Sequence, residues 1–131
     1  MILSTLSFLK FNTMKKTVII QFEAEGFHNY PNPPKEVEFL SYNHRHTFVF
    51  KCGYEVEHLN REKEIFICRD IVKKYLFEQF GNPCQFKNMS CEMIAEGMLN
   101  KYKNDGMSWC EVWEEETGGA RVQILKFILQ D

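Results

Sequence analysis

Three of the four histidines in this sequence are spaced as metal ligands often are. His44 and His46 lie two residues apart in a segment that alternates like a β-strand, so both imidazoles project from one face, about 7 Å apart at the backbone. His28 follows the preceding alternating segment, where it is placed to supply a third ligand. Three neutral imidazoles with an open fourth position are typical of catalytic zinc. The alternative is that His44 and His46 are a chance pair of half-buried polar residues.

Two β-strands are predicted to carry these histidines. Residues 16–25 alternate apolar and polar side chains with the period of a half-buried strand, and residues 44–57 do so again. The connection between them contains three prolines within four positions, which excludes regular pairing and predicts a long exposed loop. Loops of that length are often functional.

The apolar period then changes to that of a helix. Residues 67–80 follow helical spacing, and the Gly-Asn-Pro sequence at 81–83 ends the run. A second helix is predicted to begin at Ser90, a favourable N-cap, with Glu92 in its first turn. The Asn-Asp-Gly sequence at 104–106 is predicted to end it.

The remaining segment, WCEVWEEETGGARVQILKFILQ, is predicted to form two strands. Its turn is expected to contain Gly118 and Gly119, because paired glycines readily adopt the positive φ angles of tight hairpins. The order β-β-α-α-β-β predicts an α+β fold, with a four-stranded antiparallel sheet and both helices on one face. Such a sheet has two open edges, which an oligomer could hide by closing a barrel across its subunits.

Length and composition narrow the possible partners. The 131 residues have room for one domain, interpreted as residues 14–131 preceded by an N-terminal extension over 1–13. No window approaches the roughly 20 apolar residues of a membrane-spanning helix, so no membrane partner is expected. The 16 basic and 18 acidic side chains nearly cancel, so no nucleic-acid partner is expected. The five cysteines form no CxxC pair and indicate reduced thiols in the cytoplasm.

Four segments, FEAEGFH, HRHTFVF, SCEMIAEGML and VWEEETGGA, follow one another along the chain. Together they resemble the 6-pyruvoyl-tetrahydropterin and 6-carboxytetrahydropterin synthases, a family with the T-fold. The resemblance extends over residues 17–125, which is nearly the whole domain. It implies trimers stacked into a hexamer, with sites at the subunit interfaces.

The resemblance also implies roles for particular residues. The first two segments match the family's zinc site, which puts zinc on three residues: His28, His44 and His46. Ser90 and Glu92 stand in the places of a Thr and a Glu at the start of a family helix and are expected to bind substrate. Glu114 stands where the family's carboxylate holds the amino-pyrimidine edge of the pterin, because two ring N–H donors match its two oxygens.

The sequence departs from the family at the catalytic base. Family members carry a Cys shortly before the His-x-His pair, whereas this loop has none. Glu38, six residues before His44, has the spacing at which some members use Glu, so it is the candidate base. The alternative is that Glu36 and Glu38 are solvated loop charges.

One more family feature is missing from the sequence, and the role of Glu114 has an alternative interpretation. The segment FGNPCQFKNM lacks the Asp-His pair that the family carries between its helices. Glu114 is also the first of three consecutive glutamates, which could together be a solvated charge run.

Two functions are therefore expected to compete. One is a zinc-dependent carbon–oxygen lyase acting on a dihydroneopterin-triphosphate-like substrate, with Glu38 as base and Glu114 as ring anchor. The other is a non-catalytic T-fold protein that keeps the metal and binds a pterin- or purine-like metabolite. The missing Cys and Asp-His pair favour the second.

Overall fold

The computed structural model describes residues 14–125. The N-terminal extension predicted over 1–13, and the end of the last predicted strand, lie outside the described residues. In chain order the elements are β1 (Lys16–His28), η1 (Lys35–Ser41), β2 (His44–Val56), α2 (Ile65–Phe80), β3 (Cys84–Lys87), α3 (Cys91–Tyr102), η2 (Lys103–Asp105), β4 (Met107–Glu114) and β5 (Gly118–Gln123), where η denotes a 3₁₀-helix.

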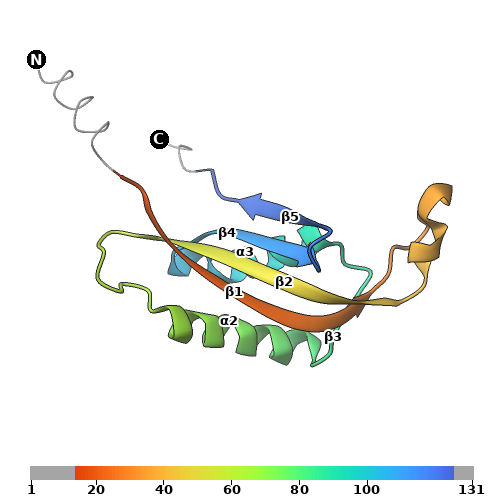
Figure 1. Cartoon of the computed structure of the whole chain (residues 1–131), viewed down its shortest axis with the longest axis horizontal. Coiled ribbons are helices and arrows are strands. Elements are labelled where there is room, and N and C mark those ends of the chain that lie inside the picture. The colour runs from red at the N-terminus through yellow and green to blue at the C-terminus, as the bar shows by residue number, and fades with distance from the viewer. Residues whose placement is uncertain (1–13, 126–131) are drawn as a thin grey trace, which may run out of the picture.

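These strands form one sheet in the order β3-β1-β2-β4-β5 (Figure 1). β1 and β2 pair antiparallel along their whole length, from Lys16 opposite Val56 to His28 opposite His44. β2, β4 and β5 continue the antiparallel pairing, whereas β3 runs parallel to β1. The α+β class is confirmed. The prediction of a four-stranded, purely antiparallel sheet was wrong, because a fifth strand pairs with the edge of β1.

β3 comes from the segment that was predicted to be a connection between the helices. Cys84 and Phe86 are buried while Gln85 and Lys87 are exposed, which is strand alternation over four residues. A run that short gives too weak a periodic signal to be recognised in a sequence. Its pairing with the end of β1 brings the residues that follow it beside His28.

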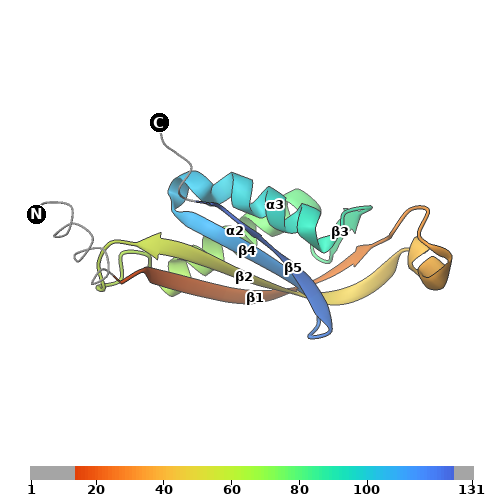
Figure 2. The ribbon, with the colours of Figure 1, turned by 90° about the horizontal axis from the view of Figure 1, so that it is seen from above.

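Both long helices cover the same face of the sheet (Figure 2). α2 lies against β1 and β3, and α3 lies against β4 and β5. The inward-facing residues of β1, β2 and β4 form one core with the apolar sides of the two helices. The predicted placement of the helices is therefore confirmed. In the described part of the chain, no helix has the length and apolar character needed to cross a membrane.

The ends of α2 and α3 follow the sequence signals. The Ser90 hydroxyl accepts a hydrogen bond of 3.2 Å from the Met93 backbone N–H, so Ser90 is the N-cap of α3 as predicted. Gly81 ends α2 with a φ of 89°, a conformation that a side chain would oppose.

The last hairpin turns differently from the prediction. Gly118 and Gly119 lie in β5 and do not form the turn, which covers 115–117. The positive φ belongs instead to Glu115, at 52°. Gly119 is needed for space, because a Cβ there would lie 2.7 Å from the Trp113 ring.

The sheet face opposite the helices carries two tryptophans that lie over glycines. A Cβ on Gly53 would lie 2.2 Å from Trp109 Nε1, so the indole occupies the space that a side chain would need. Arg121 stacks on the Trp109 ring at 4.4 Å. Its guanidinium also donates to Glu111 at 2.7 Å, so Arg121 and Glu111 hold the ring in place.

We expect Gly53→Ala to lower the free energy of unfolding by about 1–3 kcal/mol, because the new methyl group must displace the indole. Gly97→Ala is the matched control, since Gly97 lies in α3 and, apart from the helix's own backbone and the adjacent residues, no described atom lies within 4 Å of its Cβ position. It should raise the free energy of unfolding by about 0.5–1 kcal/mol through helix propensity. Urea unfolding measures both, and equal effects of the two substitutions would contradict the packing of Trp109 on Gly53.

Candidate metal centre

The three predicted histidines lie together at the end of the β1–β2 ladder. His28 and His44 are direct partners in the register, and His46 is two residues further along the same face of β2. Each residue offers one ligand atom, and these atoms lie within 4.8 Å of one another. His28 is the last residue of β1, whereas the sequence indicated a position just beyond the strand.

The Nδ1 atom of each ring is already occupied. His28 Nδ1 lies 2.9 Å from the Met89 carbonyl and His44 Nδ1 lies 2.9 Å from the Tyr42 carbonyl. His46 Nδ1 lies 3.0 Å from a carboxylate oxygen of Glu115. Because carbonyls and carboxylates only accept, each Nδ1 carries the hydrogen and donates it. Metal-ligating histidines usually have a partner of this kind behind the ring and bind the metal through Nε2. The Nε2 of His28, which donates to Glu114 at 3.0 Å, must release its hydrogen to do so.

His46 supplies the most direct indication of a missing ligand. Its Nε2 atom is buried and makes no hydrogen bond within residues 14–125, although a Glu114 carboxylate oxygen lies 3.5 Å away. A buried polar atom without a partner costs roughly 1–3 kcal/mol, and a metal ion at this point would satisfy it. Imidazole nitrogens suit zinc, copper, iron and nickel, so the three residues fit a transition metal.

Glu114 places a carboxylate against the same group. Its Oε2 lies 3.0 Å from His28 Nε2, and its Oε1 lies 3.5 Å from His46 Nε2. Burial alone would lower the pKa of His28, but hydrogen bonds to Glu114 and Met89, together with the Glu114 charge, outweigh burial and raise this pKa. The hydrogen bond from His28 in turn lowers the pKa of Glu114. Glu114 is therefore a charged group at the mouth of the histidine cluster.

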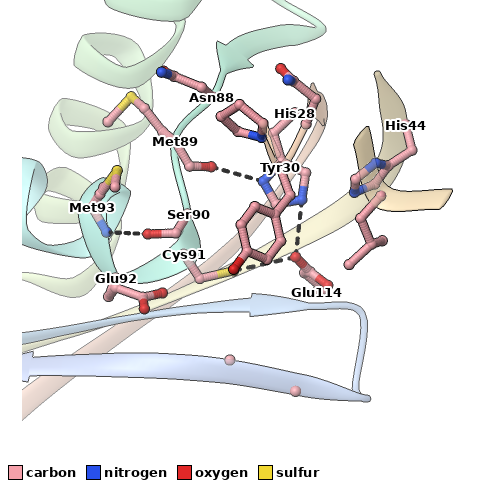
Figure 3. Close-up of a pocket in the computed structure, with 15 residues that line it drawn as sticks. His28, Tyr30, His44, Asn88, Met89, Ser90, Cys91, Glu92, Met93 and Glu114 are labelled. Carbon is pink, nitrogen blue, oxygen red and sulfur yellow. Dashed lines mark hydrogen bonds and ion pairs between the residues drawn. The ribbon is translucent and has the colours of Figure 1, made fainter. Parts of the chain in front are cut away.

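A cavity of about 600 Å³ opens beside the histidines (Figure 3). His28 and His44 form part of its wall, and so do all three residues that were predicted to bind substrate: Ser90, Glu92 and Glu114. The Ser90 hydroxyl is engaged in capping α3, so its hydrogen-bond acceptor is partly used. The wall also includes apolar side chains, among them Leu40, Met89 and Met93. The structure thus brings two of the histidines and the three predicted substrate ligands to one cavity, while His46 lies beside it in the histidine group.

Cys91 lies at the wall of this cavity and was not singled out by the sequence. Its Sγ donates to Glu114 Oε2 at 3.7 Å. Burial, and then the Glu114 charge, raise the pKa of the Cys91 thiol to about 12. The side chain is therefore a neutral thiol that supports Glu114, and it is not a thiolate ligand.

Glu38 lies away from the cavity in this chain. It is exposed in η1 and is not among the described residues that line the hollow. Leu40, two residues further along, does line it. The role of Glu38 as a base stays a prediction.

Glu115 is the residue at this centre that sequence reasoning missed. Glu114 to Glu116 looked like a possible solvated run, and Glu116 is indeed exposed. Strand alternation would also place Glu115 on the face opposite Glu114. Only the left-handed φ of 52° brings its carboxylate back to His46, and no sequence pattern announces that conformation in a glutamate.

No protein-family model matches the sequence, and a search of the curated proteins finds no match either. The resemblance to the pterin synthases therefore rests on the four sequence segments alone.

We expect His46→Ala to weaken zinc binding by more than about 100-fold, which exceeds the usual effect of losing only a partner behind a ligand. His58→Ala is the matched control, because His58 is exposed and its hydrogen bonds and ion pairs among the described residues are with its near neighbours Asn60 and Glu62. Competition with a chromophoric chelator measures the affinity, and elemental analysis gives the metal content. Equal zinc affinity in the two variants would remove His46 from the metal centre.

Proposed function

We propose that this chain is a zinc-dependent T-fold protein of the 6-pyruvoyl/6-carboxytetrahydropterin synthase type. In this proposal it acts as a carbon–oxygen lyase on a dihydroneopterin-triphosphate-like substrate. The observation that carries the proposal is a cavity lined by Ser90, Glu92 and Glu114 together with two of the three grouped histidines, His28 and His44. The four family-like segments support it, since they supply those same residues.

In this proposal, different residues of the chain hold the metal, bind the substrate ring and take the substrate proton. His28, His44 and His46 would hold the zinc, which when bound supplies a Lewis acid that polarises substrate oxygens and acidifies a neighbouring C–H. The Glu114 carboxylate would accept the N–H groups of the pterin ring, and Cys91 holds that carboxylate from behind. Glu38 would take the substrate proton. Because Leu40 lines the cavity and Glu38 does not, η1 would have to move so that the Glu38 carboxylate reaches the cavity.

The second candidate is a protein that binds the ring without turning it over. Two observations favour it: Glu38 is exposed outside the cavity, and the described lining contains Glu92 and Glu114 but no Lys or Arg. Two carboxylates with no Lys or Arg beside them suit a neutral pterin or purine better than a triphosphate. In this case the metal and the cavity would serve capture alone.

Self-association and location belong to the same proposal. β3 and β5 are the edges of the sheet, so subunits could pair there and close the trimeric or hexameric barrel that the T-fold resemblance implies. All five cysteines are buried and unpaired, which supports a reducing, cytoplasmic compartment.

Incubation of the zinc-loaded protein with dihydroneopterin triphosphate separates the two candidates. The lyase proposal expects product from the wild type, and a loss of at least about 100-fold in turnover with Glu38→Gln, because a general base contributes on that scale. Glu36→Gln is the matched control, as Glu36 is an exposed glutamate in the same 3₁₀-helix. It should leave turnover within about twofold.

The other outcomes are equally decisive. Binding of dihydroneopterin or a purine by the wild type without turnover would reject the lyase and support the capture protein. Absence of both binding and turnover, with zinc present, would reject both candidates.

A further inference from the structure

We propose that Glu115 is a positioning residue of the metal centre, which holds His46 with its Nε2 lone pair directed at the metal. The proposal goes beyond the proposed function, because it concerns the metal centre whichever ligand the cavity takes. Glu115 itself touches neither the cavity nor the Nε2 atoms in the contacts of the described chain.

The contacts of Glu115 use both of its carboxylate oxygens. Oε1 and Oε2 lie 3.0 and 3.2 Å from His46 Nδ1. Oε2 also accepts from the Thr47 backbone N–H at 2.8 Å. The carboxylate is therefore fixed to the imidazole and to the backbone of the next residue, so the ring cannot swing without breaking charge-assisted hydrogen bonds.

The backbone at Glu115 is shaped for this contact. Glu115 N–H donates to the Thr47 carbonyl at 2.9 Å, which ties the start of the turn to β2. Its left-handed φ lets two consecutive glutamates approach His46 from opposite sides, Glu114 toward Nε2 and Glu115 toward Nδ1. A non-glycine residue keeps such a conformation only where its surroundings enforce it, and such residues gather at functional sites.

A carboxylate behind an imidazole has a defined effect. It fixes the tautomer with hydrogen on Nδ1, orients the ring and makes Nε2 a stronger donor to a metal. The Nε2 atom so prepared is the one that is buried without a hydrogen bond from any described residue. His28 and His44 have neutral carbonyls in this place, so within the described metal group His46 alone has a charged partner behind the ring.

The test compares Glu115 with its neighbour Glu116, which is exposed. Glu115→Ala should weaken zinc binding by about 10- to 100-fold, and Glu115→Gln by less, since an amide oxygen still accepts from Nδ1. Glu116→Ala and Glu116→Gln should stay within about twofold of the wild type. Chelator competition measures zinc affinity, and thermal melting of the metal-free proteins reports whether each variant is folded.

Nitrogen-15 NMR of the histidine rings in the metal-free protein supplies a readout that a purely structural role would not move. His46 should be held as the Nδ1–H tautomer in the wild type and in both Glu116 variants, and should become a mixture in Glu115→Ala. If Glu115→Ala does not fold, the smaller loss of affinity in Glu115→Gln carries the test. Zinc affinity of the folded Glu115 variants within twofold of the Glu116 variants, with an unchanged His46 tautomer, would overturn the proposal. The result is independent of turnover, so a failure of the lyase proposal would leave it standing.

Discussion

The register between β1 and β2 is the constraint on which the candidate metal centre depends. His28 faces His44 only because the two strands pair residue by residue from Lys16 to His28. A slip by one residue would send His44 and His46 to the opposite face. The core opposes that slip, since Phe22 and Phe50 are partners in the same register and their rings stack with centroids 5.0 Å apart. The histidines continue the face that the apolar core occupies, so burial of the core also positions the ligands.

Three connecting segments each supply the hydrogen-bond acceptor for the Nδ1 atom of a different histidine. The segment after β3 delivers the Met89 carbonyl to His28, and the end of the η1 connection delivers the Tyr42 carbonyl to His44. The β4–β5 turn delivers Glu115 to His46. The strands therefore set where the rings stand, while the connections set which nitrogen of each ring faces the common centre. A site of this kind is sensitive to changes in loops that never touch a ligand.

Much of this architecture was predictable because its sequence signals are either periodic over many residues or local to a helix end. The alternation in β1 and β2 runs over many residues, and the Ser90 cap and the stop at Gly81 are local signals with a direct structural cause. The histidine group followed from strand geometry, because residues two apart share a face.

The remainder depends on contacts between distant segments. β3 is four residues long and exists only because it pairs with β1. Glu115 could not be distinguished from its neighbours by type, and its position follows from a single φ angle. The turn prediction from the paired glycines was wrong. Gly119 lacks a positive φ, and a glycine is needed there because a Cβ would collide with the Trp113 ring. Whether Glu38 works as a base depends on where η1 lies when a ligand is bound, which the sequence of one chain does not encode.

X-ray absorption at the zinc edge of the freshly purified protein bears most directly on the three-histidine centre. Nitrogen donors at about 2.0–2.1 Å with imidazole multiple scattering are expected, because His28, His44 and His46 converge and no cysteine belongs to this group of possible ligands in the described part of the chain. A shell of sulfur at about 2.3 Å, or a protein that holds no metal after growth in zinc, would contradict the centre described here.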